Sequence, residues 1–357
     1  MMRHALFLVA TLAAVVAPAA GKDLDPALRD KGRHAVDGGL KFLREAQAPD
    51  GSWSKSVGVT ALALRAFLES YKKPAESEPL VAHAVEFITK HVQDDGAIVE
   101  SQHDKNYNTA VAVVALQATG NAKYAPIVKK AREFLHQHQV DEGEGVKKSD
   151  PYYGGMDYGS EERPDLSNEY MALEAMHATA TDPKDPVWGK ALTFISRCQN
   201  RSESNDQPWA GNDGGFTYMP KSDGSPHGGS GSYGGMTHAG LISLIFASVD
   251  KKDPRVQAAY DWIRAHWTLD DNPGGQGKAG LYYYYEAFAK SMAAYGEPMV
   301  KTPDGVEHDW RAEYVTKMVS LQNDDGSWVN KDSTRWWEGD KNLITSRVVI
   351  GLNLATR

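Results

Sequence analysis

Gln47-Ala-Pro-Asp-Gly-Ser-Trp53 is repeated near the other end of the chain as Gln322-Asn-Asp-Asp-Gly-Ser-Trp328, with five of seven positions identical. Each copy follows an amphipathic run and precedes an apolar one. Glycine suits the end of a helix, because it adopts the left-handed conformation without a steric penalty. A match of this length between distant segments indicates an internal repeat. We therefore expect further helix–turn–helix units between the two copies.

The chain divides into six such units, each with a helical run, a turn rich in glycine and acidic or amide residues, and a more apolar helical run. In the first runs, apolar residues recur at three- and four-residue spacing, which is typical of helices with one buried face. The first runs span residues 35–46, 80–92, 127–139, 188–199, 256–267 and 312–322. The second runs align without gaps over residues 60–67, 109–116, 169–176, 237–244, 285–292 and 345–352. No alternating strand pattern persists, so we predict an all-α chain.

Helix pairs in this number could stack as an open solenoid or close into a ring. The second runs are apolar nearly all round, which indicates helices that are covered on both sides. The ends of solenoids usually carry polar capping units, whereas the first and last units here carry the strongest motif. We therefore predict a closed ring, with the second helices inside, the first helices outside and a single domain over residues 21–357.

Residues 1–20 have the pattern of a signal peptide. Met1–His4 is a short basic region, Ala5–Val16 is apolar, and Ala17–Ala19 offers small residues for cleavage. The apolar run is shorter than the roughly 20 residues that span a bilayer. We therefore expect export to the periplasm or the medium, with no transmembrane segment.

The formal net charge of −8, without a basic block, argues against nucleic acid as a partner. Cys198 is the only cysteine, so no intramolecular disulfide can form. We interpret it as a small buried apolar residue. We also expect the protein to be a monomer.

The pattern of a helix, Gln-x-x-Asp-Gly-x-Trp and an apolar helix that begins Thr-Ala resembles the repeats of squalene-hopene and oxidosqualene cyclases. It is also similar to the repeats of protein prenyltransferase β subunits. The resemblance covers roughly residues 33–355 and implies an (α/α)6 toroid, with six inner and six outer helices around an axial cavity. In the cyclases the glutamine and tryptophan of the motif join one repeat to the next. This implies structural roles for Gln47, Trp53, Gln322 and Trp328.

The chemistry of these relatives is not found in the sequence. The cyclases protonate their substrate with Asp-x-Asp-Asp just before an inner helix, and none of the corresponding stretches matches: 56–59, 105–108, 165–168 and 233–236. The prenyltransferases hold zinc with Asp, Cys and His, but Cys198 ends an outer run. We therefore expect no metal and no cofactor.

If the ring closes, all six inner helices begin at one end, where their free N–H groups favour oxygen-rich or anionic ligands. Aromatic and polar residues cluster at these helix starts, as a ligand cavity requires. Each tyrosine could instead pack in the core, and His238 could be a structural histidine. The ligand-binding candidates are Tyr107, Asn108, Tyr282, Tyr283, Trp336 and Trp337, and the catalytic candidates are His238, Tyr233, Asp165, Glu169 and Arg347.

Three functions remain open. The first is a secreted toroid that binds a small molecule or glycan in its axial cavity. The second is a secreted polysaccharide lyase or related glycan enzyme, in which Tyr, His and Arg at the mouth abstract a proton and neutralise a carboxylate. The third, which export makes less favourable, is a terpenoid cyclase with a relocated acid at Asp165 or Glu169.

Overall fold

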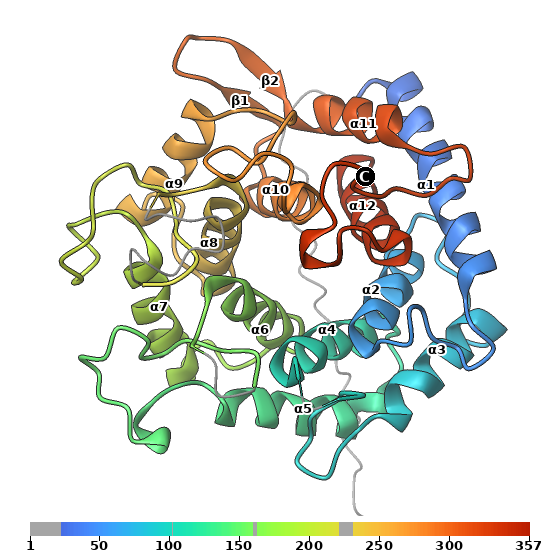
Figure 1. Ribbon diagram of the computed structural model, residues 1–357, viewed down its shortest axis with the longest axis horizontal. Coiled ribbons are helices and arrows are strands. Elements are labelled where there is room, and N and C mark those ends of the chain that lie inside the picture. The colour runs from blue at the N-terminus through green and yellow to red at the C-terminus, as the bar shows by residue number, and fades with distance from the viewer. Residues whose placement is uncertain (1–22, 102, 160–162, 221–230) are drawn as a thin grey trace, which may run out of the picture.

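The computed structural model describes residues 23–101, 103–159, 163–220 and 231–357. The predicted signal peptide lies outside these residues. Within them, twelve α-helices alternate between an outer and an inner layer around one axis (Figure 1). The outer helices are α1 (Pro26–Ala46), α3 (Pro79–Lys90), α5 (Ala125–Gln137), α7 (Pro186–Cys198), α9 (Pro254–Ala265) and α11 (Trp310–Leu321). The inner helices are α2 (Val57–Leu68), α4 (Lys105–Ala118), α6 (Leu166–Ala178), α8 (Gly234–Phe246), α10 (Leu281–Tyr295) and α12 (Lys341–Ala355).

The starts of the outer helices are encoded locally. Helices α1, α3, α7 and α9 each begin with proline directly after an acidic residue. Proline at the first helical position has the required φ angle and lacks an N–H that would go unpaired there. The Asp side chains accept backbone N–H groups of the first turn, as Asp25 does from Leu28 at 3.0 Å.

The inner helices close into a ring. Each packs against the next in chain order, and α12 packs against α2, while α1 contacts both α11 and α12 (Figure 1). All twelve residues of α2 are buried, as expected for a helix that is covered on both sides. The predicted all-α toroid is therefore confirmed, and the open solenoid is excluded.

The repeated motif joins neighbouring units. The Gln47 side-chain amide donates to the carbonyls of Gly51 and of Leu80, the latter in the next outer helix, both at 3.0 Å. Gln322 does the same across the ring closure, where it donates to Ala35 of α1 at 2.9 Å. The indole of Trp53 donates to the carbonyl of Leu43 at 2.7 Å, and Trp328 makes the equivalent bond to Met318 at 2.8 Å.

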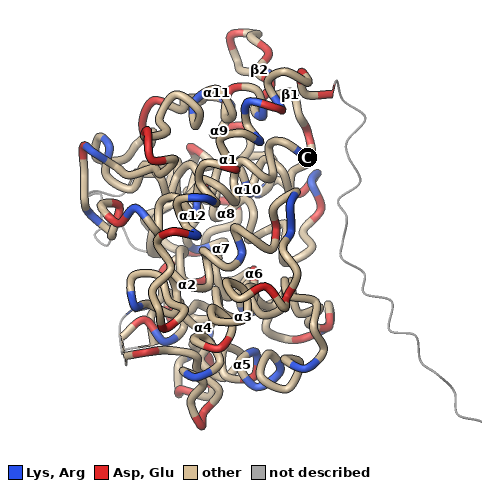
Figure 2. The backbone as a smooth tube through the Cα atoms, turned by 90° about the vertical axis from the view of Figure 1, so that its right-hand side faces the viewer, with Lys and Arg blue, Asp and Glu red and all other residues tan. Residues whose placement is uncertain are grey.

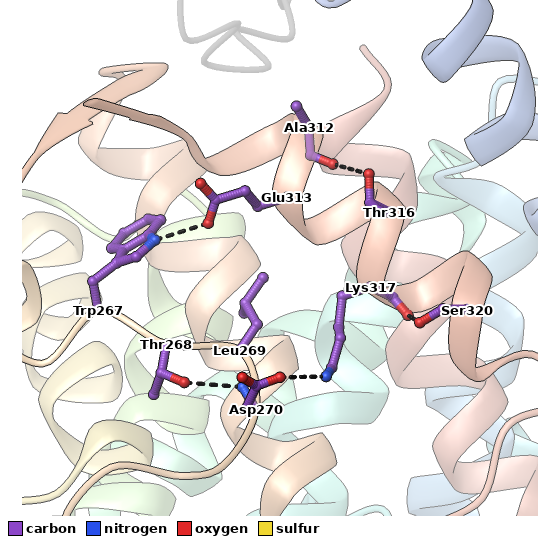
Figure 3. A pocket seen from close by; sticks show the side chains of 9 residues that line it. All are labelled: Trp267, Thr268, Leu269, Asp270, Ala312, Glu313, Thr316, Lys317 and Ser320. Carbon is purple, nitrogen blue, oxygen red and sulfur yellow. Dashed lines mark hydrogen bonds and ion pairs between the residues drawn. The ribbon is translucent and has the colours of Figure 1, made fainter. Parts of the chain in front are cut away.

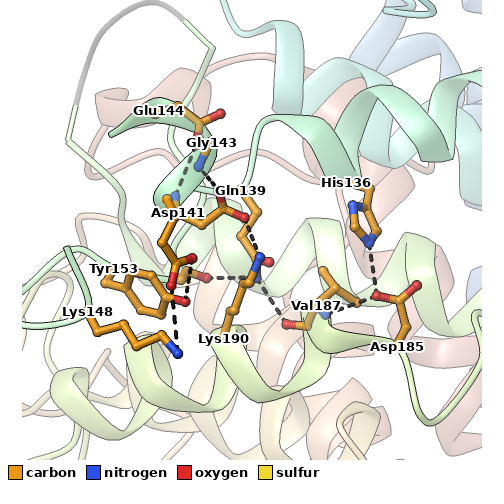
Figure 4. Close-up of polar contacts among 12 residues, drawn as sticks. His136, Gln139, Asp141, Gly143, Glu144, Lys148, Tyr153, Asp185, Val187 and Lys190 are labelled. Carbon is orange, nitrogen blue, oxygen red and sulfur yellow. Dashed lines mark hydrogen bonds and ion pairs between the residues drawn. The ribbon is translucent and has the colours of Figure 1, made fainter. Parts of the chain in front are cut away.

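Figure 4 shows a related connection between α5 and α7. The amide of Gln139 donates to the carbonyls of Gly154 at 2.9 Å and Val187 at 3.1 Å. Lys190 pairs with Asp141 beside it. The outer helices are thus connected by side chains from the turns that follow them.

Two small additions interrupt the helical pattern. A hairpin of β1 (Met299–Lys301) and β2 (Glu307–Asp309) joins α10 to α11, with Val300 opposite His308. A 3-10 turn, η3 (Arg335–Trp337), precedes α12. Acidic and basic residues are interspersed along the described chain (Figure 2). Among the described residues, no helix has the length and hydrophobicity needed to cross a membrane.

Candidate functional site

All six inner helices begin at the same end of the ring. One hydrogen bond joins the first residues of each inner helix to the loop near the start of an adjacent inner helix. The bonds are Val57 N–Glu100 Oε2, Asn106 N–Tyr158 O, Leu166 N–Tyr218 O, Gly234 N–Pro273 O, Tyr282 N–Glu338 Oε1 and Asn342 Nδ2–Ser54 Oγ. We call this end the N-terminal end of the ring.

Charged side chains meet on the ring axis. Arg65 on α2 pairs with Glu174 on α6 at 2.8 Å, and Lys290 on α10 pairs with the same carboxylate at 3.1 Å. Glu286 joins Lys290 at 2.9 Å to Arg347 at 2.6 Å. Because α2, α6 and α10 are alternate members of the ring, these bonds pass through its interior. The axial network therefore fills the axis at this level.

The axial network contains three cations, Arg65, Lys290 and Arg347, and two carboxylates that they keep ionised. Burial alone would raise the pKa of Glu174, but attraction to Arg65 and Lys290 outweighs it and lowers that pKa to about 2. Burial opposes ionisation of Glu286 as well, and Lys290 and Arg347 still hold its pKa below the usual range. Both carboxylates are therefore ionised at neutral pH.

The axial network continues into a group of tyrosines towards the N-terminal end. Arg347 donates to the Tyr107 hydroxyl at 3.2 Å, and its guanidinium carbon lies 5.2 Å from the centre of the Tyr283 ring. Burial raises the pKa values of Tyr107, Tyr170 and Tyr283, so the phenols stay protonated. Tyr107 and Tyr283 are partly exposed. Part of each of these two side chains therefore remains in contact with solvent.

Two of these phenols have open hydrogen-bonding capacity. The hydroxyls of Tyr170 and Tyr283 are buried atoms without a hydrogen-bond partner among the described residues. The charges of Glu286 and Arg347 both influence the pKa of each phenol, so both lie nearby. We define the axial site as Tyr107, Tyr170, Tyr283, Glu286 and Arg347. It can donate several hydrogen bonds beside a fixed positive charge.

Asp165 caps the start of α6. It accepts the Ser167 N–H at 2.8 Å, the Asn168 N–H at 3.1 Å and the Asn168 side-chain amide at 2.6 Å. Burial raises its pKa to about 6, against these hydrogen bonds and one from Tyr218. Tyr158, whose pKa burial also raises, lies beside it. The group is a carboxylic acid that can lose its proton near neutral pH.

Glu169 stands where four other units have threonine. Thr60, Thr109, Thr237 and Thr345 accept the backbone N–H that follows each glycine turn. Glu169 is 1% exposed, and burial raises its pKa well above the usual range. By its place in the unit it faces the turn rather than the axis.

His238 and Tyr233 belong to the packing around α8. His238 shares a hydrogen bond of 2.6 Å with the Ser291 hydroxyl of α10, between the rings of Tyr284 and Phe288. Burial lowers its pKa to about 3, so the imidazole is neutral. Tyr233 is the N-cap residue of α8 and is 3% exposed. Asn108, at the second inner helix, is buried against Gly58 of α2.

The remaining candidates lie at the rim. The backbone N–H groups of Tyr282 and Tyr283 donate to the buried carboxylate of Glu338, at 2.7 and 2.9 Å. Trp336 and Trp337 are 39% and 64% exposed, and both have left-handed φ angles, of 53° and 65°. Such angles are costly for tryptophan. The structure therefore brings Tyr107, Tyr283 and Arg347 together. His238 instead packs between α8 and α10, and Glu169 lies at the turn of its own unit.

The sequence interpretation missed Tyr170 and the charged residues Arg65, Glu174, Glu286 and Lys290. All five lie inside the second runs, whose apolar composition predicts helices that are covered on both sides. A signal was present, because Glu286 and Lys290 are four residues apart on one helix, and a buried charge needs a partner. Among the described residues, no group of three or more His, Cys, Asp or Glu side chains is placed to hold a metal ion.

Comparisons with known proteins agree with this architecture. The family model of the squalene-hopene cyclase C-terminal domain matches residues 54–219. A type II terpene cyclase, MstE from Scytonema, is 13% identical at a TM-score of 0.56, over 93% of this chain and 99% of that one. The Candida albicans protein geranylgeranyltransferase-I is 16% identical at 0.51, over 88% and 89%.

An α-amylase from Clostridium perfringens is 10% identical at a TM-score of 0.60, over 90% of this chain and 98% of that one. A search of curated protein sequences finds no match. Identities this low show the fold alone. Together with the family match they support the superfamily that the sequence resembles.

Proposed function

For a chain with the α/α toroid of the terpenoid cyclase and prenyltransferase superfamily, we propose that its function is to bind a polar ligand, a small molecule or a glycan, at the axial site. The observation that carries this is that the hydroxyls of Tyr170 and Tyr283, beside the charge of Arg347, have no hydrogen-bond partner in the part of the chain that the structure describes. We also propose that the protein is exported. N-terminal sequencing of the secreted protein should begin near residue 21, and retention of residues 1–20 would contradict it.

The axial network supports a polar ligand over an isoprenoid. Arg65, Lys290 and Arg347 place three cations on the axis. These cations would repel a carbocation formed beside them. An apolar chain would displace water from the ion pairs without replacing the hydrogen bonds that the water makes. A ligand with hydroxyl or carboxylate groups avoids both costs.

A glycan-active enzyme is the second candidate, and Asp165 favours it. Its pKa of about 6 matches the requirement for a general acid near neutral pH. The similar structures include the α-amylase above and a possible GH105 member from Salmonella. In this candidate Asp165 transfers the proton, because burial lowers the pKa of His238 to about 3, which makes it a weak base, and its ring is packed between two others.

The test is calorimetric titration with neutral, uronate and amino-sugar trisaccharides and with geranylgeranyl diphosphate. We expect a sugar to bind the wild-type protein. Tyr283→Phe should weaken that binding about tenfold, which corresponds to about 1.4 kcal/mol for one hydrogen bond. Tyr71→Phe makes the same change on an exposed tyrosine and should have no effect. Binding of geranylgeranyl diphosphate alone, or equal binding by Tyr283→Phe, would contradict the proposal.

Incubation of the protein with uronate polymers distinguishes binding from catalysis. If the protein is a lyase, uronate polymers give an unsaturated product that absorbs ultraviolet light. If it is a hydrolase, they give new reducing ends without that absorbance. If Asp165→Asn abolishes either signal, the second candidate is correct. Binding without turnover in the wild-type protein supports the first.

A further inference from the structure

Glycine turns seal the outer wall between most neighbouring units. In five units the turn glycine has a left-handed φ angle and lies directly against a carbonyl of the next outer helix, so that an added Cβ would collide with it. The pairs are Gly51–His83, Gly96–Lys130, Gly154–Lys190, Gly214–Ala258 and Gly326–Gly38. We call each contact a seam.

The unit that contains α9 lacks its seam. Its glycine turn, at Gly274, lies against the carbonyl of Ser232 at the start of α8 rather than against α11. A cavity of about 530 Å³ lies where the seam would be, between α11 and residues 267–270, which follow α9 (Figure 3). This volume is within the range of small-ligand sites.

Both walls of this cavity are held in place. On α11, the Glu313 carboxylate accepts the Trp267 indole N–H at 2.8 Å and contacts His308 of the β-hairpin at 2.6 Å. On the other wall, the carbonyls of Thr268 and Leu269 accept the hydroxyls of Tyr284 and Tyr285, at 2.6 and 2.7 Å. The hairpin insertion therefore supports the cavity instead of closing it.

Polar groups that can still bind a ligand face the opening. Asp270 pairs with Lys317 at 2.8 Å, and its side chain remains 87% exposed. Lys317 keeps further N–H donors, and the hydroxyl of Thr316, whose proton goes to Ala312, can still accept. In Figure 3, Lys317 and Asp270 lie at one end of the cavity, and Trp267 and Glu313 lie at the other.

We propose that this open seam binds a neutral polyhydroxylated ligand, a short saccharide. Among the described residues that line the cavity, two carboxylates, Asp270 and Glu313, stand against one ammonium, Lys317, so the lining has no excess of positive charge to attract an anion. A second ammonium, that of Lys278, donates to the Asp270 carbonyl beside it. An apolar ligand would bury these charges without hydrogen bonds. Sugar hydroxyls both donate and accept, and the C–H face of a sugar suits the exposed part of Trp267. The open seam lies on the outer wall, so the proposal does not depend on the axial site.

The test is titration of the full chain with maltotriose and cellotriose, followed by calorimetry and by the NMR resonance of the Trp267 indole N–H. At least one trisaccharide should bind and shift that resonance. Thr316→Trp fills the cavity from an exposed position and should weaken binding at least tenfold. Asp270→Asn should weaken it as well and keeps the outer wall intact.

Thr89→Trp is the matched control, because Thr89 also donates to the carbonyl four residues earlier in an outer helix, at 2.9 Å. It should bind like the wild type. If neither trisaccharide shifts the Trp267 resonance, or if Thr316→Trp binds normally, the proposal is wrong. Binding that is lost in Tyr283→Phe but kept in Thr316→Trp belongs to the axial site and also overturns it.

Discussion

The six units differ from one another at a few equivalent positions, and the start of α6 carries the clearest difference. Glu169 replaces the threonine that caps the turn in four other units, and Asp165 lies one helical turn before it. Both carboxyls are almost fully buried, and burial raises both pKa values. Burial at the start of α6 thus favours the protonated form of two carboxyl groups.

This position predicts a pH dependence of stability. The pKa of Asp165 rises from 3.8 unfolded to about 6 folded. Between these values the folded state binds more protons, so stability falls as pH rises from about 4 to 6, by up to about 3 kcal/mol. In Asp165→Asn this part of the decline should be missing, as measured by urea unfolding at each pH.

Asp340→Asn is the matched control, because Asp340 is also an N-cap residue, with a 2.7 Å bond to the Asn342 N–H. It measures what replacing an N-cap carboxylate costs by itself. If Asp165→Asn and the wild type lose stability in parallel from pH 4 to 6, Asp165 is not the titrating group.

The site could be predicted only in part from the sequence. Placing Tyr107, Tyr283 and Arg347 at the helix starts was enough to bring them together, because closure of the ring gathers those starts at one end. Of the consecutive tyrosines 282–285, two donate outward, from Tyr284 and Tyr285. Which side chains cross the axis depends on the rotation of each helix, and helix periodicity fixes that only when one face is polar.

At the scale of elements, the inner helices combine apolar walls with a few charges that only a closed ring can pair. Arg65 and Glu174 are 109 positions apart in the chain and meet because α2 and α6 face the same axis. The sequence predicted all twelve helical runs, the outer ones from their periodicity and the inner ones from their gapless alignment and apolar composition. It did not predict the β-hairpin, whose strands of three residues are too short to show an alternating pattern.

Removal of one charge from the axial network should be costly. In Glu174→Gln, Arg65 loses one carboxylate partner and Lys290 keeps only Glu286. We expect the free energy of unfolding in urea to fall by about 3–5 kcal/mol, as for other buried pairs that lose one member. The same change in Glu45→Gln affects an exposed pair with Lys41 and should cost under about 1 kcal/mol. Equal losses in the two variants would show that the axial charges are well hydrated.

At the scale of the whole molecule, the ring is closed by the same contacts that join its internal units. Gln322 donates to Ala35 and Gly326, both at 2.9 Å, as Gln47 donates to Leu80 and Gly51 at 3.0 Å. Gly32 of α1 lies against Thr356 at the end of the chain. The closure is therefore as well made as any internal joint.

This equivalence can be measured. Gln322→Ala and Gln47→Ala each remove two side-chain hydrogen bonds to partly buried carbonyls, so each should lower the free energy of unfolding by about 1–3 kcal/mol. In a closed ring the two losses should agree within about 0.5 kcal/mol, the usual scatter between independent sites. Urea unfolding of both variants provides the comparison. A much smaller loss in Gln322→Ala would indicate that the ends of the chain separate before the ring unfolds.

In the covalent chain α1 and α12 are the ends, but in space each lies between two neighbours. In an open stack of helices, unfolding begins at a terminal unit that has only one neighbour. The closed ring has no such unit. The order of the helices in the sequence therefore does not mark any of them as an end of the packed structure. Any of the turns between units could serve as the beginning of the chain without changing which helices touch.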